Sequence, residues 1–328
     1  MAAIAFPQHA KSLTLSTGHQ YSYVHVPAFA PTKPTVLFLH GFPSSCYDWR
    51  HQIVYFQSHG YGIIAPDLLG YGGTGKPTSP EEYRAKKMAA EIVEILDHEH
   101  LGQAHAVSHD TGSILLSRLA NYFPQRLLSC TFLSVPYSKP GQHFDLDAVN
   151  AMTKNLFGKE QFGYLKLFVS QGAGEMIEQH HDSFVNLFYP GDPSLWKDHL
   201  GPLGALESWL RADRHGPKAP YITDEERHVH RQIMQGSYRS ALQWYHVLVN
   251  NLNEEDETVS DLPAAKLTVP TLMVSPVQVE GAQPDMDATA CQEAALFTAK
   301  KVSASGHWLQ LEARDEVNVA LEEFWNSL

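Results

Sequence analysis

Short apolar runs alternate with helix-like segments along the first part of the chain, and this alternation limits the possible folds more than any other feature. Each run is four to nine residues long and largely apolar, as expected of a strand that is buried on both faces of a sheet. Alternating strands and helices predict an α/β fold with a mostly parallel central sheet covered on both sides. The runs lie at 35–39, 62–66, 104–107 and 127–135, after a loosely alternating segment at 12–26 that predicts a hairpin.

The alternation is interrupted in the middle of the chain. Residues 137–258 contain no clear buried strand and consist of aromatic-rich helical stretches broken by Pro and Gly. Strand character returns at 269–274 and again near 299–302, and an amphipathic helix closes the chain. We therefore predict an α/β core formed by residues 1–136 and 259–328, with a helical cap domain, residues 137–258, inserted between them.

The composition excludes several classes of partner. With 328 residues, 43% hydrophobic and 18% charged, the chain can bury a full globular core. A formal net charge of −12 argues against nucleic acid and against an anionic membrane surface. No apolar stretch reaches transmembrane length, and we recognise no signal peptide. Three scattered cysteines without a CxxC pair suit a reducing compartment, so we expect a cytoplasmic protein; no pattern predicts its oligomeric state.

A glycine-rich segment, GYGGTGKP at Gly70–Pro77, matches two nucleotide-binding patterns. A phosphate-binding loop needs Ser or Thr where Pro77 stands, and proline lacks the backbone N–H that would contact a phosphate. A dinucleotide site needs a helix that opens within the motif, which Pro77 and Pro80 prevent. We therefore expect a tight loop after the preceding strand and no cofactor.

Three closely spaced pairs of histidines raise the question of a metal site. Two of them have the spacing HxH, and on a helix such side chains point away from each other rather than to one face. We expect solvated surface residues and no bound metal. The pairs are His98 and His100, His180 and His181, and His228 and His230.

The segment Ser108–Gly112, SHDTG, has the pattern of a nucleophile elbow. Small residues flank a polar apex, a buried strand precedes it and a helix follows it. The apex residue is Asp110, and the positive end of the following helix would stabilise its carboxylate. The alternative role is that Asp110 only caps that helix.

Two further segments have the order expected of an α/β-hydrolase. HGFP, from His40, follows the strand whose next loop supplies one oxyanion-binding amide in that fold, and the residue after the nucleophile supplies the other. Those amides would belong to Phe42 and Thr111. The sequence Gly-His-Trp places His307 after the last predicted strand, where the histidine that follows the nucleophile is expected.

Together these motifs resemble the epoxide hydrolase branch of the α/β-hydrolase superfamily, and the resemblance spans nearly the whole chain. It rests on HGFP, the DLLGYG loop from Asp67, the Ser-His-Asp elbow, the Gly-His-Trp segment, and the cap segments QFGY and SALQWY. The cap segments match those that carry the two ring-opening tyrosines of the family. The resemblance implies that Tyr164 and Tyr245 face Asp110 from the cap; the alternative is that they only pack in an aromatic core.

The resemblance implies a covalent mechanism. Tyrosine hydroxyls would hydrogen-bond the epoxide oxygen while Asp110 attacks a ring carbon and forms an alkyl-enzyme ester. His307 would then activate water, which hydrolyses the ester to a vicinal diol. The implied partners are a small apolar epoxide and water, without a metal or a cofactor.

The acid that should orient His307 does not match the family. An ungapped comparison counted back from His307 places it at Val279, which cannot accept a proton. We expect the adjacent Glu280 to take this role, with Asp285 and Asp287 as alternatives in the same loop. The position after the strand at 127–135 offers only Ser134, which is also unsuitable.

Two other functions remain open from the sequence. A dehalogenase of the same fold would use the same aspartate and histidine, but it would need a halide-binding tryptophan where Thr111 stands. An enzyme for haloacids would need an arginine near the nucleophile, and Arg118 lies about two helical turns away. A catalytically impaired, ligand-binding member of the fold is the third possibility.

Overall fold

The computed structural model describes residues 1–30, 32–257, 266–277, 294, 296–304 and 306–328. Its centre is an eight-stranded sheet with the strand order β1-β2-β4-β3-β5-β6-β7-β8. Strands β3 to β8 run parallel to one another, and β2 pairs antiparallel with both β1 and β4. The predicted α/β class, the mostly parallel sheet and the N-terminal hairpin are therefore confirmed.

The strands are β1 (Ala10–Thr14), β2 (Gln20–Val26), β3 (Thr35–Leu39), β4 (Gly62–Pro66), β5 (Ala104–His109), β6 (Leu127–Leu133), β7 (Thr271–Pro276) and β8 (Phe297–Val302). The helices that accompany them are α1 (Ala2–Ala5), α2 (Arg50–Ser58), α3 (Ala85–His98), α4 (Gly112–Tyr122), α16 (Leu309–Glu312) and α17 (Arg314–Asn326). Short 3-10 turns are η1 (Cys46–Trp49), η2 (Pro80–Tyr83) and η3 (Pro124–Arg126). The run at 81–100 predicts a longer helix than α3, which begins only after Arg84 because that residue has extended backbone angles.

The sheet is covered on both faces, as its apolar strands require. Along β3, Leu37 and Leu39 join the cluster that includes α3 and α4, whereas Val36 and Phe38 join the cluster that includes α2 and α17. Successive side chains of a strand point to opposite faces, so a continuous apolar strand fills two cores at once. Strand β5, which ends next to the predicted nucleophile, lies in the middle of this sheet, between β3 and β6.

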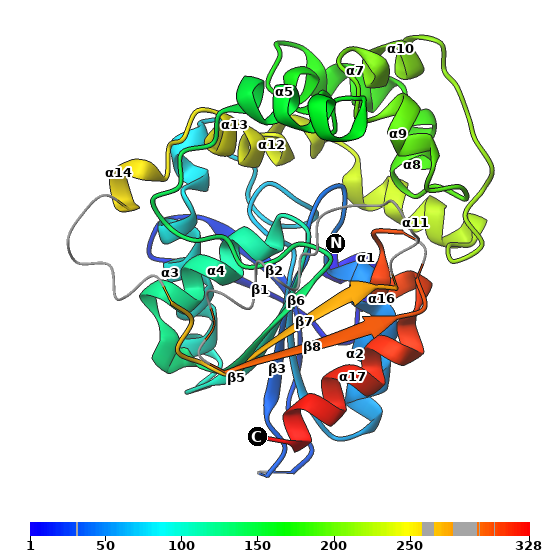
Figure 1. The fold of residues 1–328 in the computed structure, drawn as a ribbon. Helices are drawn as coiled ribbons and strands as arrows, with labels where there is room; N and C mark the ends of the chain where they lie inside the picture. The colour runs from blue at the N-terminus through cyan, green and yellow to red at the C-terminus, as the bar shows by residue number, and fades with distance from the viewer. Residues whose placement is uncertain (31, 258–265, 278–293, 295, 305) are drawn as a thin grey trace.

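Between β6 and β7 the chain forms a layer of helices on the side of the sheet where the parallel strands end (Figure 1). We call helices α5 to α14 the inserted helices. They are α5 (Leu146–Phe157), α6 (Tyr164–Phe168), α7 (Ala173–Gln179), α8 (His181–Phe188), α9 (Leu195–His199), α10 (Ala205–Arg211), α11 (Asp224–Met234), α12 (Tyr238–Ala241), α13 (Gln243–Val249) and α14 (Glu254–Glu257). None of the described helices is both long and apolar enough to span a bilayer.

Candidate active site

Asp110 stands at a sharp turn between β5 and α4. Its φ of 53° lies in the left-handed region, which is uncommon for a residue with a side chain and typical of strained functional turns. The turn is possible because Gly112 has no side chain: a Cβ there would lie 2.5 Å from the carbonyl oxygens of Leu39 and His40. Asp110 does not cap α4, because its carboxylate bonds to Phe42 and His307 instead. The alternative role as a helix cap is therefore wrong.

The backbone amide of Phe42 donates to Oδ1 of Asp110 at 2.9 Å. His40 fixes the peptide unit that carries this amide, since its Nδ1 bonds to the carbonyl oxygen of Gly41 at 2.8 Å. The tautomer follows from the other ring nitrogen, Nε2, which accepts from the Leu68 amide at 2.9 Å and so leaves Nδ1 as the donor. Burial lowers the pKa of His40, which keeps the ring neutral. Within the described chain, the Thr111 amide does not bond to the Asp110 carboxylate.

His307 lies 3.3 Å from Oδ2 of Asp110 through its Nε2. Its carbonyl oxygen accepts two bonds, from Nε2 of His109 at 2.9 Å and from Oγ of Ser134 at 2.6 Å. The Glu312 carboxylate accepts from the amides of the two residues on either side, Gly306 and Trp308, both at 3.0 Å. The main chain of the histidine loop is thus fixed at three points, the His307 carbonyl and the amides of Gly306 and Trp308.

The electrostatics of the pair favour an ionised nucleophile. Burial alone would raise the pKa of Asp110, but the hydrogen bond and charge of His307, followed by the hydrogen bond from the Phe42 amide, lower it to about 2. Burial, and next the charge of His307, lower the pKa of His109 to about 3, so this neighbouring ring stays neutral. Asp110 therefore carries its negative charge at any physiological pH.

Tyr164 and Tyr245 lie above Asp110 on two of the inserted helices. Tyr164 is the first residue of α6 and Tyr245 lies in α13. Burial, and next the Asp110 charge, raise the pKa of both hydroxyl groups far above the ordinary value. Phe168 packs against both rings, with centroid distances of 5.2 and 4.8 Å. The structure thus brings both predicted tyrosines within electrostatic reach of the predicted nucleophile, as protonated donors.

The glycine-rich loop supports α12 and α13. Gly70 and Gly72 have φ values of 94° and 50°, as the expected tight path requires. Carbonyl groups of this loop accept hydrogen bonds from the inserted helices. The Leu69 carbonyl accepts from Nε1 of Trp244 at 2.9 Å, and the Gly70 carbonyl accepts from Oγ of Ser240 at 2.8 Å. Trp244 precedes Tyr245 in α13, so these bonds fix the position of Tyr245 relative to the core.

Gly41 is the residue on which the geometry of the nucleophile depends most directly. A Cβ at this position would lie 2.4 Å from Cβ and 2.5 Å from Oδ1 of Asp110. We predict that Gly41→Ala lowers kcat/KM about 100-fold, because a displacement of reacting groups by about 1 Å has costs of this order. Steady-state kinetics on a soluble epoxide checks this. Gly102→Ala is the matched control, since a Cβ there meets nothing within 4 Å; equal kinetics for the two variants would contradict the prediction.

Some expectations from the sequence need correction. His181 and His230 are not solvated: they are only 4% and 3% exposed and lie within the inserted helices, with ring centroids 5.6 Å apart. The helix-like spacing could not reveal this, because burial depends on how the inserted helices pack. No group of three or more metal-ligating side chains occurs among the described residues. The guanidinium of Arg118 pairs with the buried Glu257.

The expected triad acid, Glu280, lies outside the described residues, as do Val279, Asp285 and Asp287. Within the described part of the chain, Asp110 is the one carboxylate that pairs with the His307 ring. Sequence reasoning missed the residues that hold the loops, namely His40, His109 and Glu312. The one signal available in the sequence was that His40 stands two residues before Phe42, whose amide was expected to bind the oxyanion.

Tryptophan side chains near His307 have no free N–H groups. Nε1 of Trp196 donates to the carbonyl of Leu187 at 2.7 Å, and Nε1 of Trp308 donates to that of Phe188 at 2.6 Å. The position after the nucleophile is Thr111, as the sequence shows. A halide ion therefore finds no indole donor of the expected kind among these residues.

Comparisons with known proteins agree with this geometry. A family profile described as alpha/beta hydrolase fold matches residues 34–173. The chain is 30% identical over 317 residues to Epoxide hydrolase A of Mycobacterium tuberculosis, covering 92% of this chain and 94% of that protein. It is 25% identical to Bifunctional epoxide hydrolase 2 of Sus scrofa, covering 89% of this chain but 51% of that longer protein. A crystal structure of Epoxide Hydrolase A from Mycobacterium thermoresistibile superposes with a TM-score of 0.77 at 25% identity, covering 96% and 97% of the two chains.

The sheet order, the elbow and the histidine loop define an α/β-hydrolase with an aspartate at the nucleophile position. Within that superfamily the chain belongs to the epoxide hydrolase family, as the extent of the match to the mycobacterial protein shows. It is therefore a hydrolase, and the family expected from the sequence motifs is confirmed.

Proposed function

We propose that this protein converts a small apolar epoxide and water to a vicinal diol through a covalent ester on Asp110. The observation that carries the proposal is the placement of the ionised Asp110 carboxylate beside the half-buried Tyr164 and the buried Tyr245, whose pKa values are raised by burial and next by the Asp110 charge. An ionised carboxylate suits displacement at a saturated carbon, whereas protonated phenols suit a leaving oxygen. Residues 137–258 would act as the cap domain that closes over this site, on the core of residues 1–136 and 259–328.

In the first step the hydroxyl groups of Tyr164 and Tyr245 donate to the epoxide oxygen. The Asp110 carboxylate attacks a ring carbon, the carbon–oxygen bond breaks, and the charge that develops on the oxygen is stabilised by the two donors. One of the tyrosines gives its proton to this oxygen and is left as a phenolate, so the product is an alkyl ester on Asp110 with a neighbouring hydroxyl group. Both tyrosines are protonated at neutral pH, because burial and the nearby carboxylate raise their pKa values.

In the second step His307 takes a proton from a water molecule, which attacks the carbonyl carbon of the ester. The amides of Phe42 and Thr111 would stabilise the oxyanion, and collapse of this intermediate releases the diol, whose leaving oxygen takes the proton back from His307. The Asp110 carboxyl group then ionises, and its proton restores the tyrosine hydroxyl through solvent. We assign the acid that orients His307 to Glu280. Hydrogen bonds to the main chain of Gly306 and His307 would also hold this loop in place beside Asp110.

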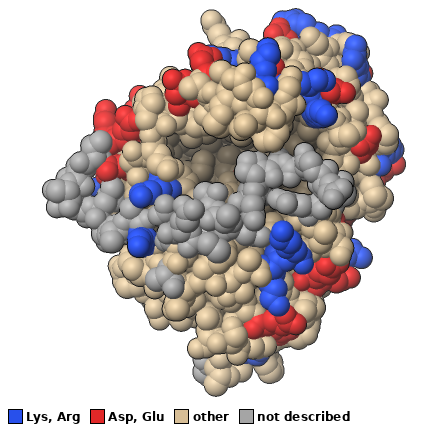
Figure 2. Space-filling model, in the orientation of Figure 1, with Lys and Arg blue, Asp and Glu red and all other residues tan. Residues whose placement is uncertain are grey.

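An apolar substrate agrees with the surface around the site. Between the inserted helices and the core the surface is hollowed, and the visible atoms in this hollow belong to residues other than Lys, Arg, Asp and Glu (Figure 2). The ring of Phe42 has aromatic neighbours on several sides, including Phe168, Phe184 and Phe188. A dehalogenase of the same fold is disfavoured because the indole N–H groups near His307 bond to backbone carbonyls.

Intact-mass spectrometry with a panel of aliphatic and aromatic epoxides tests the proposal. We expect an adduct with the mass of the epoxide, located on Asp110 by peptide mapping. A single turnover in oxygen-18 water should give a diol that is free of the label, because its new oxygen comes from Asp110. Label in the first-turnover diol would overturn the covalent mechanism. Binding without adduct or diol would instead support a ligand-binding protein on this fold.

The pH dependence should separate the two steps. Because the pKa of Asp110 is lowered to about 2 and those of both tyrosines are raised, we predict that ester formation changes little between about pH 5 and pH 9. We expect any change of turnover within this window to come from ester hydrolysis. Rapid-quench measurement of the ester checks the prediction for the first step; a midpoint for ester formation between about pH 5 and pH 9 would contradict it.

The lowered pKa of Asp110 also contributes to the stability of the fold. This contribution is present above the ordinary carboxyl pKa of about 3.9 and is lost as the pH falls through about 2.

A further inference from the structure

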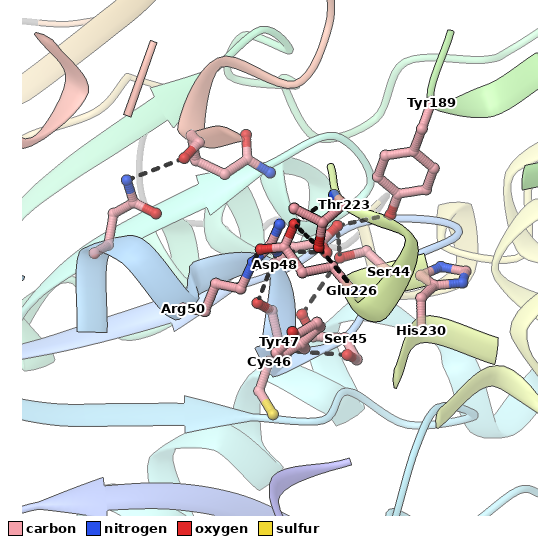
Figure 3. Close-up of polar contacts among 12 residues, drawn as sticks. Ser44, Ser45, Cys46, Tyr47, Asp48, Arg50, Tyr189, Thr223, Glu226 and His230 are labelled. Carbon is pink, nitrogen blue, oxygen red and sulfur yellow. Dashed lines mark hydrogen bonds and ion pairs between the residues drawn. The ribbon is translucent and has the colours of Figure 1, made fainter. Parts of the chain in front are cut away.

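A buried polar network connects the inserted helices to the core beside the Phe42 loop (Figure 3). Its centre is Asp48 in η1, which is 2% exposed. The Asp48 carboxylate accepts from Oγ of Ser44 at 2.8 Å and from the hydroxyl of Tyr189 at 2.7 Å. Arg50 lies 3.7 Å from the same carboxylate and pairs with Glu226 of α11 at 2.6 Å. The Arg50 guanidinium thus lies between two carboxylates, those of Asp48 and Glu226.

The hydroxyl of Tyr189 also reaches the Phe42–Pro43 segment. It lies 2.7 Å from the carbonyl oxygen of Pro43, and Nε2 of His230 lies 2.8 Å from the same oxygen. Burial, and next the Asp48 charge, raise the pKa of Tyr189 well above its ordinary value, so the hydroxyl keeps its one proton, which it shares between the Asp48 carboxylate and the Pro43 carbonyl. Two residues of the inserted helical region therefore hold the residue next to the Phe42 amide.

The ring of Tyr189 contacts the other half of the site. It stacks on the indole of Trp308, with centroids 4.0 Å apart and planes 14° apart. Nε1 of Trp308 donates to the carbonyl oxygen of Phe188, the neighbour of Tyr189, at 2.6 Å. Trp308 follows His307 directly in sequence. One segment, Phe188–Tyr189 at the end of α8, thus contacts both the loop with the oxyanion amide and the loop with the base.

We propose that Tyr189 is a positioning residue that sets the distance between the Phe42 amide and the His307 ring, and thereby controls hydrolysis of the ester. The inference rests on the proposed function. Tyr189 touches neither substrate nor reacting atoms; its hydroxyl acts through Pro43 and its ring acts through Trp308. In ester formation the Phe42 amide and His307 contact Asp110 but take up no developing charge, whereas in ester hydrolysis the amide must stabilise the oxyanion while His307 takes the proton. Loosening Tyr189 should therefore slow the second step alone.

Tyr189→Phe tests this, because it removes the hydroxyl and keeps the ring on Trp308. In rapid-quench and intact-mass experiments with an epoxide that the wild type turns over, we expect an unchanged rate of ester formation and about tenfold slower ester hydrolysis, below the ~100-fold typical of losing an oxyanion donor outright. The ester should accumulate, so kcat and KM fall together while kcat/KM is retained. A residue with a merely structural role would lower the active fraction and leave this partition unchanged.

Tyr221→Phe is the matched control. Its hydroxyl, like that of Tyr189, donates to a backbone carbonyl. The acceptor is Pro190 at 3.2 Å, and Tyr221 makes no hydrogen bond to Pro43. We expect wild-type rates of both steps from this variant. If Tyr189→Phe does not fold, His230→Asn removes the other donor to the Pro43 carbonyl and should shift the partition in the same direction.

The outcomes separate the inference from the proposed function. If the wild type forms neither adduct nor diol with the epoxide panel, the proposed function is overturned, and the role of Tyr189 in it is overturned as well. If the wild type is active and Tyr189→Phe hydrolyses the ester at the wild-type rate, only the inference is overturned. The same holds if both steps slow equally in Tyr189→Phe.

Discussion

Replacing Asp110 with alanine is expected to abolish the covalent adduct and to lower epoxide turnover by about 10⁴-fold or more, the order seen when a catalytic nucleophile or its activating partner is removed. The backbone of Asp110 lies in the left-handed region, and its ionised carboxylate is bonded to Phe42 and His307. No other described carboxylate pairs with His307. Intact-mass spectrometry and diol formation after incubation with epoxide measure the two effects.

His307→Gln is the informative comparison for this variant. It keeps the nucleophile but removes the base, so the adduct should form and then persist for far longer than in the wild type. An adduct that still forms in Asp110→Ala would contradict the assignment of the nucleophile. Failure of both variants to form an adduct would indicate that His307 contributes to the first step, through its pairing with Asp110.

The sheet and the elbow could be predicted because they depend on local patterns. Continuous apolar runs such as 35–39 require burial on both faces, which only a covered parallel sheet provides. The apex at Asp110 could be found because its flanking small residues have a steric purpose, confirmed at Gly112 by the contacts that a Cβ would make. The residue that must be small stands two residues after the apex, so the requirement leaves a trace in the sequence even though the contacting carbonyls belong to Leu39 and His40.

The supports of the site could not be predicted in this way. Glu312 bonds to the main chain on both sides of His307, and Tyr189 contacts Pro43 and Trp308 across more than a hundred residues of sequence. His230 has the spacing of a surface histidine but is buried against the Pro43 carbonyl. These contacts depend on how the inserted helices pack on the core, which no periodicity encodes. The aromatic character of that region indicated burial without indicating which residue meets which.

The two cap tyrosines should contribute through their hydroxyl groups alone. We predict that Tyr164→Phe and Tyr245→Phe each slow ester formation about 100-fold, and that the double variant slows it by about 10⁴-fold or more, since each donor to a developing oxyanion is worth about this much. Ester hydrolysis should change little, because the epoxide oxygen is already a hydroxyl group at that stage. Rapid-quench measurement of the ester in single turnovers separates the two rates.

The expected asymmetry between the steps distinguishes acid catalysis from packing. Phe168 contacts both tyrosine rings, and Phe keeps these contacts, so a packing role predicts wild-type rates in all three variants. Phe168→Leu is the control that disturbs the packing and retains both hydroxyl groups, and it should affect thermal stability more than the rate of ester formation. A substrate with a better leaving group needs less help from an acid, so an epoxide with an electron-withdrawing substituent should lose less rate in the double variant. A loss that is equal for all epoxides would argue that the tyrosines position the substrate and do not protonate its oxygen.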